Sequence, residues 1–246
     1  MTSRKHIKDG SQSVLFFGRN RCDASEKILI HLKKLGFKVK NVKSNHRGEK
    51  LPKDIGSWEG DFILCFRSLF FLPMSLLDKP KVAAINFHPG PPEYPGSGCI
   101  NFALYDESET YGVTAHIMND KIDNGKILEV RRFTIYENEG LPSLLERTHK
   151  ELLNLCLDFV SNLEQKSASF IEDKLQQSRN FSWNGEARKM EELERLQIIN
   201  VNVEKSRLEK IIRATHTKNY PPKIILHGYE FLLNLNNKNG NGNPLK

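Results

Sequence analysis

The chain has 246 residues, 38% hydrophobic and 27% charged, which is typical of a globular protein with one α/β domain and a smaller appendage. No apolar stretch approaches the ~18 residues that span a bilayer, and the basic N-terminus has no apolar run of signal-peptide length behind it. We therefore expect a cytoplasmic protein with no membrane partner. The net charge of +7 comes from basic ends around an acidic middle, which suits nucleic acid and anionic small molecules alike.

The first third of the chain alternates between strand and helix patterns. The apolar run 13–17 stops at a glycine, and residues 24–35 then place isoleucine and leucine on one helical face. Residues 37–42 alternate as a half-buried strand does. Strand, helix, strand is the usual start of a parallel α/β sheet.

Two continuous apolar runs, 61–66 and 82–87, have the length of strands covered on both faces. The β-rich runs 111–118 and 126–135 flank a turn, and 141–163 has the pattern of a long amphipathic helix. These patterns predict an α/β fold with a Rossmann-like, mostly parallel sheet and helices on both faces. We assign it to a catalytic domain over residues 1–165.

Apolar residues become sparser after residue 165, and residues 166–246 are expected to form a small C-terminal α+β domain with a disordered tail. Within it, 206–215 has a helical pattern, and two short strands, 223–226 and 229–233, meet at a glycine. This spacing predicts a β-hairpin. Because an unpaired strand edge favours self-association, we expect a homodimer through this region.

The four cysteines are far apart and include no Cys-x-x-Cys pair. The sequence therefore predicts reduced thiols, with neither a disulfide framework nor a metal site. Cys99 lies beside the motif described next, but no neighbouring residue marks it as a nucleophile.

The stretch NFHPGPPEYPG, residues 86–96, has the clearest chemical content. Asn86 and His88 are two residues apart, so in a strand their side chains share a face, at the end where open α/β sheets bind ligands. Asp123 follows in the turn NDKIDNG, which Gly125 allows to close tightly. Alone, each polar residue has an ordinary explanation as a core histidine, a strand-end cap or a turn aspartate. Together they point to a catalytic site.

An Asn-x-His-Pro, a proline-rich loop and an Asp-x-Gly-x-Ile-Leu turn, in this order, resemble the formyltransferases that use N10-formyltetrahydrofolate. The resemblance covers residues 13–135. The sugar-nucleotide branch of this family is the most similar, by the sequence of this loop, the IIRA helix at 211–214 and the YPP that follows it. Two departures are visible: Asn119 stands where relatives often carry an acid, and the loop reads PPEYPG where the tRNA and purine enzymes have SLLP.

The resemblance implies transfer of the formyl group of N10-formyltetrahydrofolate to the amine of a sugar nucleotide. We expect dTDP-4-amino-4,6-dideoxyglucose, in a pathway to surface polysaccharide such as lipopolysaccharide O-antigen. In such a transfer Asn86 would donate a hydrogen bond to the oxyanion and His88 would carry the proton. Asp123 would orient the imidazole or hold the attacking ammonium. Which of the three acts as the base stays open.

The resemblance also implies a pterin held by two loops, 68–72 and 119–123, with Phe70, Leu72, Asn119 and Asp123 as contacts. Side chains that suit the nucleotide are basic, polar or aromatic, and the candidates are Lys8, Arg19, Asn20, Tyr220 and Lys223. Of these, Arg19 and Asn20 follow the first strand, where a helix N-terminus can receive an anion. Tyr220 could stack on a pyrimidine.

Two alternatives stay open. The acceptor could be methionyl-tRNA, which needs a long positive surface for phosphates. Here the segment from residue 166 has 81 residues and a net charge of +5, which is short for such a domain, and we expect no nucleic-acid partner. The other alternative is a non-catalytic binding protein on the same fold.

Overall fold

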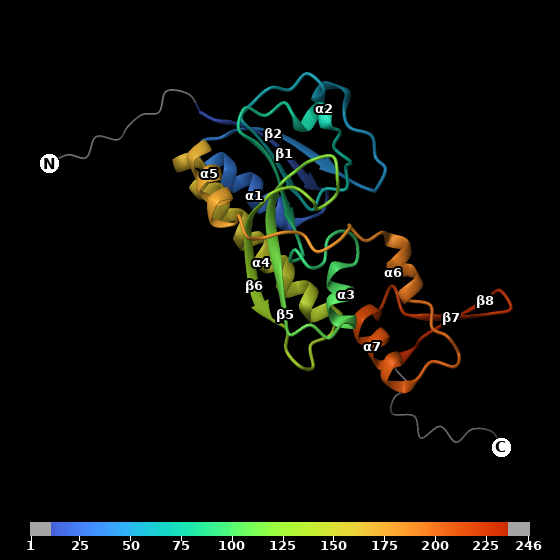
Figure 1. Ribbon diagram of the computed structural model, residues 1–246. Helices are drawn as coiled ribbons and strands as arrows, with labels where there is room; N and C mark the ends of the chain where they lie inside the picture. Colours follow the sequence, from blue (N-terminus) through green and yellow to red (C-terminus); the bar gives the residue numbers. More distant parts are fainter. Residues whose placement is uncertain (1–10, 236–246) are drawn as a thin grey trace, which may run out of the picture.

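The computed structural model describes residues 11–235, and a six-stranded sheet forms its body (Figure 1). Its strand order is β2-β1-β3-β4-β5-β6, in which β2, β1, β3 and β4 are parallel and β5 and β6 run antiparallel to their neighbours. The strands are β1 (Ser13–Arg19), β2 (Lys38–Ser44), β3 (Phe62–Phe66), β4 (Ala83–His88), β5 (Thr110–Ile117) and β6 (Ile127–Thr134). The expected mostly parallel sheet is confirmed.

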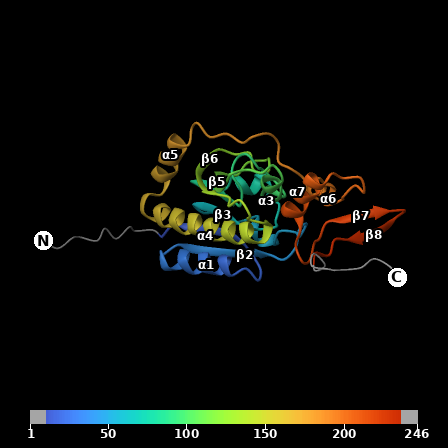
Figure 2. The ribbon, with the colours of Figure 1, turned by 90° about the horizontal axis from the view of Figure 1, so that it is seen from below.

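The sheet has a hydrophobic core on each face because its central strands contain continuous apolar runs. Along β1, Val14 and Phe16 belong to one core, and Leu15 and Phe17 belong to the other. The first core is covered by two helices that pack against each other (Figure 2), α1 (Asp23–Lys34) and α4 (Leu141–Lys166). Both helices bury the apolar face that the sequence predicted for them.

The second face has a thinner cover. A 3₁₀ turn (Lys53–Ile55), the short helix α2 (Met74–Leu77) and the loops between them supply Ile55, Trp58 and Leu76 to this core. Longer helices thus lie on one face of the sheet, and loops cover much of the other. Loops rather than long helices therefore lie over the strand ends on this second face, and loops can carry polar groups.

Three further helices were not predicted from the sequence. They are α3 (Cys99–Tyr105), α5 (Ala168–Gln177) and α6 (Met190–Leu196). Each is short, and the pattern of apolar residues over one or two turns does not distinguish a helix from a loop. In α5, Phe170 and Ile171 are buried in the same core as α1 and α4. The main core therefore includes residues beyond position 165.

The C-terminal part contains α7 (Lys205–Thr215), which packs against α3, and a two-stranded sheet of β7 (Lys223–Leu226) and β8 (Tyr229–Leu232). These strands pair antiparallel around His227 and Gly228, so the predicted hairpin is confirmed. It projects from the body beyond α7 in both views (Figures 1 and 2). The tail that we expected to be disordered lies outside the described residues from position 236. Between residues 11 and 235 we find no helix with the length and apolar character needed to cross a membrane.

Candidate active site

Asn86 and His88 end strand β4, on the face of the sheet opposite α1 and α4. They alternate with Phe87, which lies in the core beneath those helices, so both polar side chains point the other way. β1, β3 and β4 are neighbouring parallel strands, so their carboxyl ends lie side by side. The structure thus gives both residues the placement that their spacing predicted.

Asp123 reaches these two residues from the turn between β5 and β6. Its backbone is left-handed, with φ +43°, which aspartate tolerates better than most residues. Two residues on, the backbone of Gly125 passes so close to Ile117 that a Cβ would lie 1.8 Å from the Ile117 carbonyl oxygen. Only glycine fits there, and this close approach directs the turn and its carboxylate toward the end of β4.

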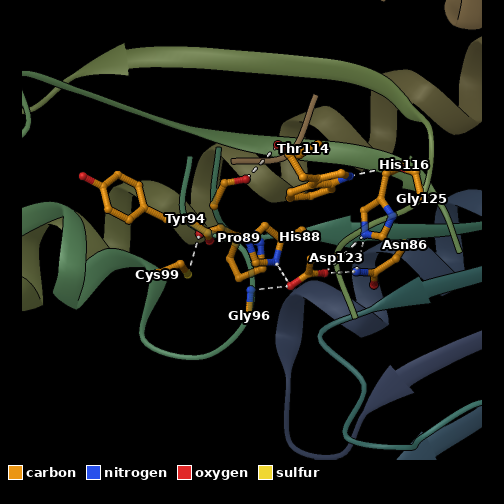
Figure 3. A network of polar contacts seen from close by, with 12 residues as sticks. Asn86, His88, Pro89, Tyr94, Gly96, Cys99, Thr114, His116, Asp123 and Gly125 are labelled. Carbon is orange, nitrogen blue, oxygen red and sulfur yellow. Dashed lines mark hydrogen bonds and ion pairs between the residues drawn. The ribbon is translucent and has the colours of Figure 1, made fainter. Parts of the chain in front are cut away.

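The Asp123 carboxylate is 8% exposed and lies among four nitrogen atoms (Figure 3). Its Oδ2 accepts the backbone N–H of Gly96 at 2.8 Å and lies 3.1 Å from Nδ1 of His88. Its Oδ1 lies 3.3 Å from Nε2 of His116 and 3.5 Å from Nδ2 of Asn86. The three predicted catalytic side chains are therefore in one contact group, and His116 is a fourth member.

His88 faces a hydrogen-bond acceptor at each ring nitrogen. Nδ1 faces the Asp123 carboxylate, and Nε2 lies 3.2 Å from the carbonyl oxygen of Tyr94. Both nitrogens can donate only in the imidazolium form. Burial alone would lower the pKa of His88, but the charge and hydrogen bond of Asp123 outweigh it and raise that pKa. Burial likewise opposes the charge of Asp123, yet His88 and His116 hold the pKa of this carboxyl well below its usual range.

His116 was missed in the sequence. Its Nδ1 lies 2.8 Å from the carbonyl oxygen of Ile117, and its Nε2 lies on the side of Asn86 and Asp123. The amide nitrogen of Asn86 lies 3.1 Å from this Nε2. This contact also orients Asn86, with its N–H groups toward His116 and Asp123. Asn86 and His116 are directly opposite in the β4–β5 register, which the sequence alone does not give.

Trp183, also missed, lies in the segment between α5 and α6. Its ring is edge-on to His88, with centroids 5.7 Å apart, and edge-on to His116, at 5.0 Å. Its indole N–H donates to the carbonyl oxygen of Gly125 over 2.7 Å. In the sequence this tryptophan stands in a polar stretch without a regular pattern, so nothing there connected it with the site.

The residues expected to contact the pterin lie in two loops. Phe70 is half-buried, packs against the second core and is edge-on to Phe17 at 5.9 Å, and Leu72 packs against the same core. Asn119 is half-buried at the start of the Asp123 turn, where its side chain accepts the backbone N–H of Lys121.

Arg19 and Asn20, two of the residues expected to bind the nucleotide, line a cavity of about 790 Å³. Arg21 and Arg67 line the same cavity, and the sequence analysis did not select them. No described carboxylate forms an ion pair with the three arginines. Asp23 lines the cavity too, but burial and the charge of Arg19 outweigh the opposing effect of Cys22 and lower the pKa of Arg67.

The other nucleotide candidates lie elsewhere. Lys8 is outside the described residues. Tyr220 is 72% exposed just before β7, and Lys223 in β7 pairs with Glu230 across the hairpin. Since the hairpin projects beyond α7 while the cavity lies at the start of α1, the structure does not bring these residues together with Arg19 and Asn20 (Figure 1).

Comparison with known proteins gives the site a family context. The chain is 31% identical over 120 residues to methionyl-tRNA formyltransferase of Thermosynechococcus vestitus, a match over 48% of this chain and 36% of that protein. It is 29% identical over 142 residues to the same enzyme of Listeria innocua, over 57% of this chain and 45% of that protein. The chain thus spans less than half the length of these relatives.

Solved structures share the fold over most of the chain. A 4-N formyltransferase from Francisella tularensis superposes with a TM-score of 0.69 at 16% identity, over 91% of this chain and 97% of that one. PseJ from Anoxybacillus kamchatkensis, a formyltransferase in complex with UDP-4,6-dideoxy-4-formamido-L-AltNAc and tetrahydrofolate, gives 0.58 at 21% identity over 74% and 88% of the two chains.

The family model for formyl transferases matches residues 15–159, which is more than half of the chain and includes Asn86, His88, His116 and Asp123. The matched range starts in β1 and ends within α4, so it contains five strands of the large sheet in full and most of β1. By this match, and by the shared fold, the chain belongs to the formyl transferase family.

Proposed function

We propose that the protein transfers the formyl group of N10-formyltetrahydrofolate to the amine of a nucleotide-linked aminosugar. The observation that carries this proposal is the buried His88–Asp123 pair beside Asn86. It joins an acid, a base and an amide donor at the end of one strand in a member of this family. The finer assignment, to dTDP-4-amino-4,6-dideoxyglucose and surface polysaccharide synthesis, is part of the same proposal.

In the proposed reaction the neutral amine attacks the formyl carbon and a tetrahedral oxyanion forms. The amide nitrogen of Asn86 makes two contacts, and the one with Asp123, at 3.5 Å, is the longer. The N–H on that side is the donor available to the oxyanion. His88 gives its Nε2 proton to the departing N10 nitrogen, and the proton lost by the amine returns to the His88–Asp123 pair. The products are the formamide and tetrahydrofolate.

The same proposal places the pterin between the loops of Phe70 and Leu72 and of Asn119 and Asp123. Both loops lie on the face of the sheet to which Asn86 and His88 point. PseJ was solved with tetrahydrofolate, which supports a folate co-substrate for this fold.

We place the diphosphate of the acceptor in the cavity of Arg19, Asn20, Arg21 and Arg67. Guanidinium groups without carboxylate partners favour a phosphate, which they can bind bidentately. The cavity lies at the ends of β1 and β3, and two strand spacings place β1 roughly 10 Å from β4. This distance is comparable to the span of one hexose, so an amine on the sugar would reach Asn86 and His88.

A methionyl-tRNA acceptor is the second candidate, because the relatives named above use it. A release assay for tetrahydrofolate separates the possibilities: we expect turnover with dTDP- or UDP-linked aminosugars and none with methionyl-tRNA. Turnover with the tRNA alone would overturn the sugar assignment, and no turnover with either would favour a non-catalytic protein.

Arginine variants test the diphosphate placement. Arg67→Gln should raise the KM for the sugar nucleotide by at least about tenfold, since a charge-assisted contact contributes on the order of 1.5 kcal/mol or more. The KM for formyltetrahydrofolate should stay unchanged. Arg47→Gln, at an exposed position away from the cavity lining, is the matched control. Equal KM values in both variants would rule out this placement.

The division into a catalytic domain, residues 1–165, and a C-terminal domain, residues 166–246, stays part of the proposal. The burial of Phe170 and Ile171 in the main core moves the working boundary to the segment after α5. We further propose a homodimer in which the exposed β7–β8 hairpin forms the interface.

A further inference from the structure

The segment of residues 178–189 joins α5 to α6 and crosses the sheet on the face opposite α1 and α4 (Figures 1 and 2). It carries Trp183 to the two histidines of the site. We propose that Trp183 is a positioning residue for formyl transfer, an aromatic wall that holds His88 and His116 against Asp123 and keeps water from their contacts. The inference rests on the proposed function.

Contacts with both rings support this role. The indole plane makes angles of 72° with His88 and 84° with His116, so each pair is edge-on. Edge-on packing is the favourable arrangement for aromatic rings and limits how far an imidazole can rotate. His88 and His116 both touch Asp123, so one indole restricts two of the four groups around the carboxylate.

The indole is itself fixed at two places. Its Nε1–H donates to the carbonyl oxygen of Gly125, in the turn that carries Asp123. Directly after Trp183, the backbone of residues 184–188 bonds to the proline-rich loop and to the residue that follows it. The N–H of Asn184 donates to Pro92, that of Arg188 donates to Pro95, and the Arg188 carbonyl accepts from Ser97. Trp183 therefore connects the Asp123 turn with the loop that follows His88.

Charge near the two imidazoles comes mainly from Asp123. The other titratable groups in their surroundings are Cys65 of β3 and Cys99 of α3, and burial raises the pKa of these thiols to about 12 and about 11. Both thiols stay neutral at physiological pH. Water admitted by loss of the indole would screen the Asp123 charge, so the pKa of His88 should fall toward its ordinary value.

Kinetics of two variants test the positioning role. In Trp183→Ala, kcat should fall by about tenfold or more while both KM values change by less than about threefold, because the loss concerns orientation rather than binding. The alkaline limb of the pH–rate profile, where the His88 imidazolium loses its proton, should move to lower pH. Trp183→Phe keeps a ring beside the histidines and should recover most of kcat. Trp58→Phe, a buried tryptophan in the second core, is the control and should leave the alkaline limb in place.

Fluorescence gives a reading that does not depend on turnover. The chain has two tryptophans, so Trp58→Phe leaves Trp183 as its single indole. A neighbouring imidazolium quenches indole emission, and emission should therefore rise with pH, with a midpoint above the ordinary histidine pKa of about 6.5. Emission that stays flat from pH 5 to 9, or a Trp183→Ala enzyme with the parent's kcat and pH profile, would overturn the inference. A parent without turnover on any amine would instead refute the proposed function, with the fluorescence result still standing.

Discussion

The imidazole of His88 and the carboxylate of Asp123 form an ion pair 3.1 Å apart, with side chains 5% and 7% exposed. Burying both charges is unfavourable unless each has further partners. Here His88 has a second partner in the carbonyl oxygen of Tyr94, and Asp123 has a further partner in the backbone N–H of Gly96. The pair is consequently a stability element as well as a candidate for catalysis, and the two roles can be measured separately.

We expect Asp123→Asn to lower the free energy of unfolding by about 3 kcal/mol near pH 6, because it leaves a buried histidine without its counter-ion. The raised pKa of His88 means that the native state binds more protons than the unfolded state above pH 6.5, so this contribution declines as pH rises through the folded pKa. The lowered pKa of Asp123 means that the contribution declines again as pH falls below 3.8.

Urea unfolding of parent and variant at pH 4, 6 and 9 checks this dependence. The difference between the two proteins should be largest at pH 6 and smaller at pH 9. Asp158→Asn serves as the control, because this carboxylate pairs with Arg131 but is 62% exposed. A difference that grows steadily from pH 6 to pH 9 would contradict the assigned direction for His88.

The three polar residues Asn86, His88 and Asp123 should behave as one unit in catalysis. Each alanine variant should lose about 100-fold or more in kcat, since each removes a proton-transfer or oxyanion contact, with little change in nucleotide affinity. The triple variant should be scarcely slower than the slowest single variant. Steady-state kinetics of folded variants decide the matter, and turnover within about fivefold of the parent in all three would refute the catalytic assignment.

A methyl group added at Gly90 should disturb His88 directly. A Cβ there would lie 2.5 Å from Nε2 of His88 and 3.0 Å from the Cβ of Cys99, so the imidazole must move. We expect Gly90→Ala to lower kcat by about tenfold or more, because displacement of a reacting group by about 1 Å has effects of this size. Gly140→Ala is a suitable comparison, since a Cβ there would lie 4.0 Å from Pro142, an ordinary van der Waals contact. Equal kcat in the two variants would mean that His88 needs no fixed position.

The β7–β8 hairpin should mediate dimerisation. Ile225, Leu226, Phe231 and Leu232 are between 42% and 61% exposed, an apolar surface that favours burial against a second copy. Light scattering at about 10 µM should give a dimer for the parent and a monomer for the double variant Phe231→Ser and Leu232→Ser, because hot-spot contacts are concentrated in few large side chains. Ile30→Ser on α1, 52% exposed, should remain dimeric. A monomeric parent, or a dimeric hairpin variant, would refute this interface.

The sequence allowed the sheet and the triad to be predicted because both depend on local patterns. Apolar runs identified the central strands, and the two-residue spacing of Asn86 and His88 fixed their common face. His116 and Trp183 depend on long-range geometry instead. His116 enters through the register of β4 and β5, and Trp183 through a segment whose path is set by backbone bonds to the proline-rich loop.

The place of Arg67 in the cavity could not be predicted from local sequence patterns either. It follows β3 with a left-handed backbone, φ +53°, and so turns toward Arg19 and Arg21 at the end of a neighbouring strand. An arginine in that conformation is uncommon and has no sequence signature. Only the strand order β1-β3-β4 reveals that Arg67 lines one cavity with Arg19 and Arg21, which are more than 40 residues away in the chain.

The bonds between residues 184–188 and the proline-rich loop have a consequence for biosynthesis. A chain that has left the ribosome only through α4 contains every strand of the large sheet, together with Asn86, His88 and Asp123, but it lacks Trp183 and the backbone partners of Pro92 and Pro95. Contacts of such high sequence separation form late, after the entropy of closing the intervening loop has been overcome. The sheet can therefore assemble during synthesis, while the surroundings of His88 are completed only after the segment beyond α5 has emerged and docked.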